Sequence, residues 1–166
     1  LIDDKFNISS KFRYLIQFLT SFLLVYNSPT YFIIRDFSGI NLVLLFLILT
    51  IIGTAIINFS NFMDGLDGLL AGVMIIIFIS LSFALDIKYL LICGPLIGSL
   101  KWNWNPAKIF MGDVGSTFLG GMLFYSLLAS KTFDNSVLIL LISSPILVDP
   151  IVCLIIRLIN KQSIFS

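Results

Sequence analysis

Long apolar segments alternate with short polar ones along almost the whole chain. Predominantly apolar residues fill 42–52, and an uninterrupted apolar run covers 74–79. A membrane-spanning helix needs about 20 such residues, and the pattern predicts about six spans. Their expected bounds are 12–26, 41–57, 69–85, 89–100, 114–130 and 136–156. The sequence therefore predicts an all-α integral membrane protein, a polytopic helical bundle that forms one domain over residues 1–166.

Two of these segments depart from a simple span. The segment 12–26 is short, and tilt or a partly hydrated end would compensate for its length. The segment 89–100 is also short and contains Gly94, Pro95 and Gly98, so we expect a kinked or irregular helix there. We expect connecting loops at 27–39 and 101–113, and the Trp residues of the second loop favour a membrane interface.

The composition supports a membrane location and limits the chemistry. Hydrophobic residues make up 58% of the chain and charged residues only 11%, with a mean hydropathy of +1.07, whereas ordinary soluble domains are about 25% charged. The net charge of +1 argues against nucleic-acid binding, which needs many clustered Lys and Arg. There is no His, and all nine acidic residues are Asp. Any metal would therefore have oxygen ligands, which favours Mg²⁺, Mn²⁺ or Ca²⁺ over zinc.

The distribution of cations predicts an orientation in the membrane. Arg35, Lys88 and Lys131 fall on one side of the expected topology, and all the other Lys and Arg residues fall on the opposite side. The side richer in cations is expected to be cytoplasmic, so we expect a multi-pass protein of the inner (plasma) membrane. On this topology the cytoplasmic carboxylates are those of Asp3, Asp4, Asp64, Asp67 and Asp113.

Polar residues recur at every third position between two apolar segments, at Asn58, Asn61, Asp64 and Asp67. Residues three apart are surface neighbours on a helix, so we expect these side chains to line one side of a helix end. Carboxylates between apolar segments need water, a cation or a proton to tolerate that position. This stretch is therefore the first candidate for a site.

Two further acidic segments are expected on the same side of the membrane. One is Ile2-Asp3-Asp4, and the other is Lys108-Ile-Phe-Met-Gly112-Asp113-Val-Gly115-Ser116. Glycine permits positive φ and close backbone approach to an anion, and helix-terminal N–H groups can bind phosphate oxygens. Carboxylates beside such an anion-binding backbone require a bridging cation. Mg²⁺ held by one or two protein oxygens and by substrate phosphates satisfies both features.

These motifs carry a family resemblance. The segment Asn61-Phe-Met-Asp64-Gly-Leu-Asp67-Gly68-Leu69, followed by the segment 108–116, closely resembles the polyprenyl-phosphate hexose-1-phosphate transferases, glycosyltransferase family 4. Leu1-Ile-Asp3-Asp4, with Ser9-Ser10-Lys11-Phe-Arg13 behind it, is similar to that family's first acidic motif. The segment 102–108 is more similar to the bacterial surface-polysaccharide branch than to the peptidoglycan branch. The resemblance covers nearly all 166 residues.

The resemblance implies transfer of a sugar 1-phosphate, expected to be an N-acetylhexosamine 1-phosphate, from a UDP-sugar to a polyprenyl phosphate, with release of UMP. In a bacterium the lipid would be undecaprenyl phosphate. By position, Asn61 and Asp113 would ligate Mg²⁺ or alternatively Mn²⁺, and Asp64 and Asp67 would support the metal and the nucleotide. The other implied contacts are Asp3 and Asp4 beside the attacking lipid phosphate, and Lys11, Asn58, Lys108 and Gly112 at the substrates. A homodimer is left open.

The chemistry of the acceptor favours direct attack over a covalent enzyme intermediate. A phosphomonoester has a second pKa near 6, so the lipid phosphate is mostly dianionic at neutral pH and needs no strong base. Positioning and charge neutralisation then suffice. We expect Asp3 or Asp4 to orient the lipid phosphate for in-line attack.

Other interpretations of these residues stay open. Asp64 and Asp67 could be helix caps at a membrane edge. Asp3 and Asp4 could belong to a solvated loop, and Lys108 could serve only to set the orientation of the protein in the membrane. A prenyltransferase or a CDP-alcohol phosphotransferase is another enzyme class, although the spacing in 64–69 matches neither. The non-enzyme alternative is an intramembrane cation or proton-coupled transporter. The clustering of the carboxylates at the cytoplasmic helix ends argues against a transporter, because a transport pathway would place them through the membrane.

The sequence also departs from the family that it resembles. Members usually have further helices before the first acidic motif and a His-containing loop after the last expected span. This chain contains no His and begins at Leu1, so we expect a piece of a longer protein, truncated at both ends. We expect the isolated piece to be inactive or weakly active.

Overall fold

The computed structural model describes residues 10–130 and 132–160, and its regular elements in these ranges are all helices. In chain order they are α2 (Ser10–Tyr26), α3 (Pro29–Ile34), α4 (Ile40–Met63), α5 (Leu69–Ala84), η1 (Ile87–Tyr89), α6 (Leu90–Asn103), α7 (Gly112–Leu128), α8 (Phe133–Ile142) and α9 (Ser144–Ile159). The all-α prediction is confirmed for the described part of the chain.

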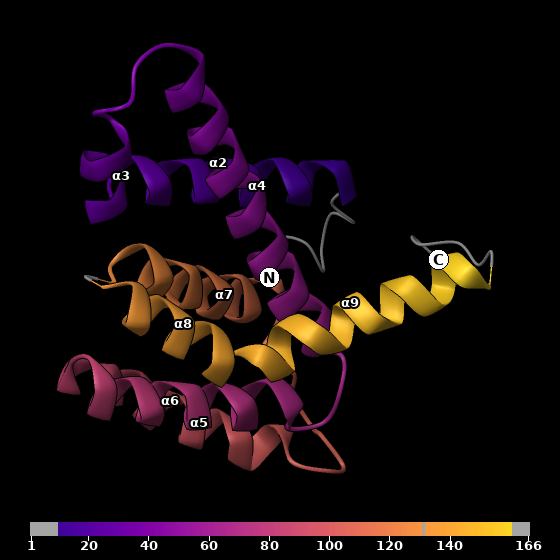
Figure 1. The fold of residues 1–166 in the computed structure, drawn as a ribbon. Helices are drawn as coiled ribbons and strands as arrows, with labels where there is room; N and C mark the ends of the chain where they lie inside the picture. The colour runs from indigo at the N-terminus through magenta and orange to yellow at the C-terminus, as the bar shows by residue number, and fades with distance from the viewer. Residues whose placement is uncertain (1–9, 131, 161–166) are drawn as a thin grey trace.

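Helix α4 is the centre of the fold. It runs steeply past α2 and α7, whereas α5 and α6 lie together as a pair and α9 extends away from the other helices (Figure 1). The most extensive helix contacts are those of α4 with α7, α5 with α6, and α2 with α4. The buried core includes Ile56, Met74, Phe78, Leu123 and Phe124. The C-terminal end of α4 is thereby fixed beside the N-terminal end of α7, where the acidic motifs lie.

Glycine permits the close approach of α4 to its neighbours. A Cβ added at Gly120 of α7 would lie 2.8 Å from the Ile57 Cα on α4. A Cβ added at Gly53 of α4 would clash with the Phe124 ring and with the Ser21 hydroxyl. Small residues at helix crossings let backbones approach in this way, as is common in membrane helices.

The substitution Gly53→Ala in the full-length protein is expected to destabilise the bundle. Overpacking a tight core costs about 1–3 kcal/mol, and here the added methyl group meets α2 and α7 together. The control is Gly72→Ala in α5, where nothing lies within 4 Å of the added Cβ and Ala is the better helix former. Thermal unfolding in detergent should show a lower Tm for Gly53→Ala and an equal or higher Tm for Gly72→Ala. Equal Tm values for Gly53→Ala and wild type would contradict the close packing.

The described helices differ in their capacity to cross a membrane. By length and apolar composition, α4 with its 24 residues qualifies alone, and α8 with α9 qualifies only as a pair that is bent by 62°. Helix α5 is apolar but has 16 residues. The count of about six spans is therefore not confirmed and stays a prediction.

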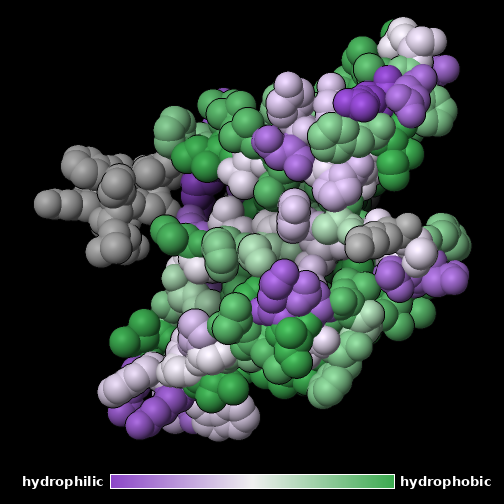
Figure 2. All heavy atoms as spheres, turned by 90° about the vertical axis from the view of Figure 1, so that its left-hand side faces the viewer, coloured by the Kyte–Doolittle hydropathy of each residue, from purple (hydrophilic) through white to green (hydrophobic). Residues whose placement is uncertain are grey.

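Much of the surface is apolar. Large apolar side chains such as Phe83 (86% exposed), Leu91 (77%) and Val114 (76%) lie on different helices. Figure 2 shows hydrophobic side chains spread over one face of the molecule, interrupted by separate hydrophilic groups. Extended apolar surface of this kind is typical of contact with a membrane or with further protein.

Several expected boundaries were wrong for identifiable reasons. The loop expected at 27–39 contains α3, because Ser28 caps its first turn by accepting from the Tyr31 N–H and Pro29 is favourable at a first helical position. The last expected span is two helices that break at Ser143. Pro145 follows, and it cannot donate to the Leu141 carbonyl one turn back.

Two other segments are more regular than expected. The segment 89–100, expected as a kinked or irregular helix, forms the continuous helix α6 with Pro95 inside it. One missing backbone hydrogen bond is tolerated there because α6 packs closely against α5. Helix α4 extends to Met63 rather than ending at residue 57, and α6 extends to Asn103, so the polar loop between α6 and α7 covers only 104–111.

Candidate active site

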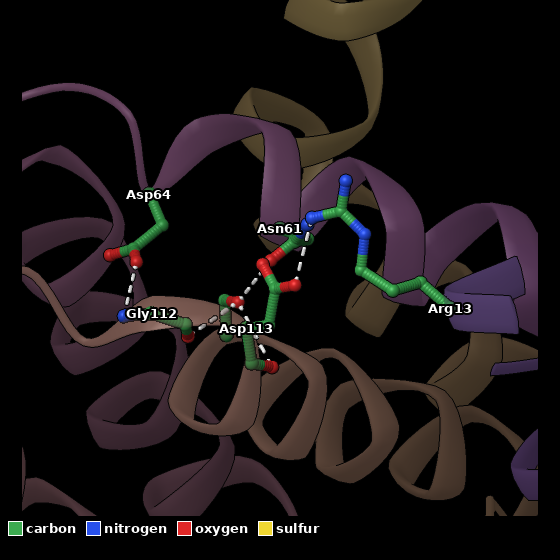
Figure 3. A network of polar contacts seen from close by, with 6 residues as sticks. Arg13, Asn61, Asp64, Gly112 and Asp113 are labelled. Carbon is green, nitrogen blue, oxygen red and sulfur yellow. Dashed lines mark hydrogen bonds and ion pairs between the residues drawn. The ribbon is translucent and has the colours of Figure 1, made fainter. Parts of the chain in front are cut away.

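The end of α4 and the start of α7 meet through a buried carboxylate. Asp64 follows the last residue of α4 and is only 7% exposed, and its Oδ2 accepts from the Gly112 N–H at 2.7 Å. Gly112 has a φ of +67°, which only glycine adopts without strain. The positive φ expected of glycine in this motif is thereby confirmed at Gly112. Figure 3 shows the Asp64 carboxylate turned toward Gly112.

Asp113 and Asn61 lie on the other side of this contact. The Arg13 guanidinium on α2 donates through Nη1 to the Asp113 Oδ2 at 2.9 Å, and Asn61 Oδ1 accepts from the Ser116 hydroxyl at 2.6 Å. Figure 3 shows the Asp113 carboxylate turned toward the Arg13 guanidinium. Asp113 also lies in the first turn of α7, where the helix dipole favours a negative charge. Residues from α2, α4 and α7 therefore converge on one site.

Burial shifts the protonation of Asp64. Loss of solvation raises the pKa of its carboxyl above the ordinary value, and the nearby negative charge of Asp113 raises it further. The backbone N–H groups of Gly112 and Met111 lower the pKa and offset part of this rise. The second oxygen, Oδ1, is buried and accepts no hydrogen bond from any described residue. A buried carboxylate oxygen without a partner is costly in an apolar protein, and a cation or a donor from a ligand would relieve that cost.

The loop between α4 and α5 is braced by the loop between α6 and α7. Asn103 at the end of α6 accepts from the Gly68 N–H through Oδ1 (2.9 Å) and donates to the Ile109 carbonyl through Nδ2 (3.0 Å). Asp67 Oδ2 accepts from the Ala107 N–H at 3.1 Å. Asn103 is 2% exposed. These bonds hold the acidic loop of 64–68 against the segment that leads into Asp113.

A cavity of about 650 Å³ opens beside these residues, between α2, α4 and α9. Its polar lining includes Arg13, Gln17, Asn58, Asn61 and Arg157, and its apolar lining comes from α4 and from α9. The cavity therefore joins the polar residues around Asn61 to an apolar lining on α4 and α9.

The other candidate residues from the sequence lie in different surroundings. Asn58 and Asn61 lie on α4, but the helix ends at Met63, so Asp67 lies in the following turn and does not share one helix side with them. Lys11 is exposed on α2. Lys108 is exposed, with its Nζ 5.8 Å from the centre of the Trp102 ring. Asp3 and Asp4 lie outside the described residues.

Sequence reasoning missed several residues that organise the site. Arg13 entered the sequence analysis only as part of the segment behind the first acidic motif, yet it pairs with Asp113 across α2 and α7. Asn103 is one of several polar residues in 102–108. An Asn side chain near a helix end was the only sequence feature that could have indicated its role. Ser116 closed the acidic segment 108–116 without a role of its own, although its hydroxyl donates to Asn61.

The donor atoms present are compatible with Mg²⁺. No group of three or more His, Cys, Asp or Glu gathers at a metal-binding spacing within 10–130 and 132–160, so these residues form no all-protein cage. Mg²⁺ is usually bound by one or two carboxylates plus substrate phosphates and water. The unpartnered Asp64 Oδ1 and the side-chain oxygens of Asn61 and Asp113, from the end of α4 and the start of α7, are oxygen donors of the kind that Mg²⁺ accepts.

Comparison with known proteins decides the family. The sequence model of "Glycosyl transferase family 4" matches residues 1–131. The chain belongs to this family. The resemblance seen in the acidic motifs is thereby confirmed, and the chain is a member of a family of phosphosugar transferases.

Curated relatives agree with this assignment. A "Probable undecaprenyl-phosphate N-acetylglucosaminyl 1-phosphate transferase" of Bacillus subtilis is 32% identical over 187 residues, which cover 99% of this chain and 50% of the relative. A "Phospho-N-acetylmuramoyl-pentapeptide-transferase" of Kosmotoga olearia is 39% identical over 117 residues, which cover 64% of this chain and 37% of the relative. The corresponding enzyme of Enterococcus hirae is 41% identical over 115 residues, covering 61% of this chain and 35% of the relative.

These relatives are much longer than the chain, which spans half of their length or less. No solved structure matches the chain significantly.

Proposed function

We propose that the protein containing this chain transfers an N-acetylhexosamine 1-phosphate from a UDP-sugar to undecaprenyl phosphate and releases UMP. The observation that carries the proposal is the convergence of Asn61, Asp64 and Asp113 at the N-terminal end of α7, next to Arg13 and a half-apolar cavity. Family membership and the names of the relatives support a sugar-phosphate transfer to a polyprenyl carrier.

The two substrates have chemically distinct places in this arrangement. The carboxylates and the N-terminus of α7 suit a nucleotide diphosphate with its metal ion. The cavity between α2, α4 and α9 combines Arg13, Arg157 and polar amide side chains with an apolar lining, and this combination suits a lipid phosphate. In our proposal the acidic end of the site faces the cytoplasm, where UDP-sugars are made, and the apolar helices lie in the inner membrane.

The reaction we propose is one in-line displacement. An oxygen of the lipid phosphate forms a bond to the β-phosphorus of the UDP-sugar, and the bond between that phosphorus and the bridging oxygen breaks. UMP leaves with the bridging oxygen. Asn61 and Asp113 would hold Mg²⁺, with Asp64 in support, and the bound metal would neutralise phosphate charge. Arg13 aligns the Asp113 carboxylate, and Asn103 fixes the loop that carries Asp67.

The test is UMP release by the full-length protein in membranes from a panel of UDP-N-acetylhexosamines. Release should require both undecaprenyl phosphate and Mg²⁺, should stop when EDTA is added, and should resume with excess Mg²⁺ or Mn²⁺. A lipid-linked sugar diphosphate should appear in equal amount. Stoichiometric UMP release without any lipid would contradict direct attack, and no turnover with any UDP-sugar would contradict the proposed function.

A further inference from the structure

Ser116 is a fully buried hydroxyl at the junction of α4 and α7. It is 0% exposed and lies one turn after the start of α7. Its Oγ is 2.6 Å from the Asn61 Oδ1, 3.0 Å from the Gly112 carbonyl oxygen and 3.4 Å from the Asp113 carbonyl oxygen. A Ser hydroxyl has one hydrogen to donate, and the shortest of these distances is the one to the amide. We therefore assign that hydrogen to the bond with Asn61.

This bond fixes the orientation of the Asn61 amide. The two ends of an Asn amide are nearly equal in shape, but the oxygen accepts hydrogen bonds and the nitrogen donates them. A separation of 2.6 Å is ordinary for an O–H···O bond and shorter than an N–H···O bond, so the end that faces Ser116 is the oxygen. Among the described residues the Asn61 side chain has no other hydrogen bond. Ser116 therefore holds the oxygen on the side of Asn61 that faces α7.

The packing of α4 against α7 places the Ser116 hydroxyl. One turn further along α7, a Cβ added at Gly120 would lie 2.8 Å from the Ile57 Cα on α4. Ile57 is one turn before Asn61, so the two helices run in opposite directions past each other and the next contact toward the site is Ser116 with Asn61. The short Ser side chain suits this narrow space. A helix crossing, rather than a loop, sets the position of the hydroxyl, as precise sites require.

We propose that Ser116 is a positioning residue for the metal site, whose hydroxyl keeps the oxygen of the Asn61 amide, and not its nitrogen, available to a divalent cation. The inference rests on the proposed function for the role of Asn61 as a ligand. An amide oxygen has two lone pairs, so it can accept from Ser116 and still bind a cation. Mg²⁺ takes oxygen ligands, whereas the amide nitrogen presents only hydrogens.

The experiment measures Mn²⁺ binding to the full-length protein in detergent by electron paramagnetic resonance, with Mn²⁺ alone as the probe. The binding at issue is the part that Asp113→Asn abolishes. Ser116→Ala removes the hydroxyl, and Ser126→Ala is the matched control. Ser126 is a buried Ser of the same helix, 1% exposed, whose hydroxyl donates to the Met122 carbonyl one turn back. Any general effect of losing a buried hydroxyl from α7 is therefore common to both variants.

Ser116→Ala should raise the Mn²⁺ dissociation constant about 10- to 100-fold, the usual effect of removing a group that orients a metal ligand. Ser126→Ala should leave it unchanged. The Mg²⁺ concentration that gives half-maximal UMP release should rise with Ser116→Ala by a similar factor, and excess Mg²⁺ should restore most of the rate. The Tm without metal should change alike in the two variants.

A double-mutant cycle with Asn61→Asp separates orientation of the amide from a structural role. Both ends of a carboxylate are oxygens, so neither orientation is wrong for a cation. In the Asn61→Asp background, Ser116→Ala should therefore raise the dissociation constant by at most about threefold. The difference between the two fold changes is the coupling between the residues, which a purely structural effect of Ser116 would not produce.

Equal Mn²⁺ affinity of wild type and Ser116→Ala would overturn the inference, and so would an equal loss of affinity in the two backgrounds. If Asn61→Asp does not fold, the comparison of Ser116→Ala with Ser126→Ala decides the question alone. Absence of transfer by wild type would contradict the proposed function, but Mn²⁺ binding needs no turnover and still tests Ser116. Absence of Mn²⁺ binding that depends on Asp113 would overturn the inference even if transfer occurs.

Discussion

Asp113→Asn is expected to lower the transferase rate about 10³-fold in the full-length protein, within the range for loss of one preorganised electrostatic group. The substitution keeps the shape of the side chain but removes the negative charge that Arg13 contacts at 2.9 Å. It also removes the carboxylate that we expect to hold the metal. UMP release measured at saturating UDP-sugar and undecaprenyl phosphate gives the rate, and a Mg²⁺ titration should show that more metal is required.

The stability of Asp113→Asn should remain close to that of wild type. The Asp113 and Arg13 side chains are 35% and 41% exposed, and ion pairs at such exposure contribute only about 0–1 kcal/mol. A large loss of activity with little change in Tm therefore separates a role in the reaction from a structural role.

The matched control is Asp86→Asn, which removes another carboxylate in an ion pair, with Lys88 at 3.4 Å. Asp86 lies beyond the far end of α5, and its substitution should leave the rate unchanged. Near-normal activity of Asp113→Asn would indicate that this carboxylate only stabilises the first turn of α7.

The elements of this fold were largely readable from hydrophobic periodicity. The expected helices at 12–26, 69–85 and 114–130 correspond within a few residues to α2, α5 and α7, because long apolar runs flanked by Asn, Gly or Asp give clear ends. The breaks were less readable. Pro95 and Pro145 have the same chemistry, yet α6 continues through the first and the chain bends by 62° just before the second. Tertiary packing of α6 on α5 decided that difference, and packing cannot be read from local sequence.

The candidate site was predicted as a set of motifs but not as a set of contacts. Spacing brought Asn61, Asp64 and Asp113 to attention, and the structure joins them through Gly112 and Ser116. The partners from distant segments, Arg13 and Asn103, had no special spacing to reveal them. Contacts across a bundle depend on which helix faces meet, and one sequence does not contain that information.

Asp64→Asn is expected to lower activity at least about 10²-fold while leaving the fold as stable as wild type or more stable at neutral pH. The amide retains an oxygen that can accept from the Gly112 N–H, a bond that is 2.7 Å long in wild type. Burial raises the pKa of the Asp64 carboxyl, so the folded state binds its proton more tightly than the unfolded state does. The stability that this group contributes is fully present below the unfolded pKa, about 3.9. It is lost as pH rises toward the raised folded pKa.

The difference in Tm between Asp64→Asn and wild type should therefore become more positive as the pH increases from about 4 toward neutrality. Thermal unfolding over that pH range measures it, with Asp86→Asn as the comparison. Hydrogen bonding from the Lys88 N–H lowers the pKa of Asp86, so removal of that carboxylate should change Tm in the opposite direction as pH rises. If Asp64 were only a helix cap, Asp64→Asn would keep wild-type activity. Loss of activity without loss of stability instead means that the protein retains a buried carboxylate, at a cost to folding, because the reaction needs its charge.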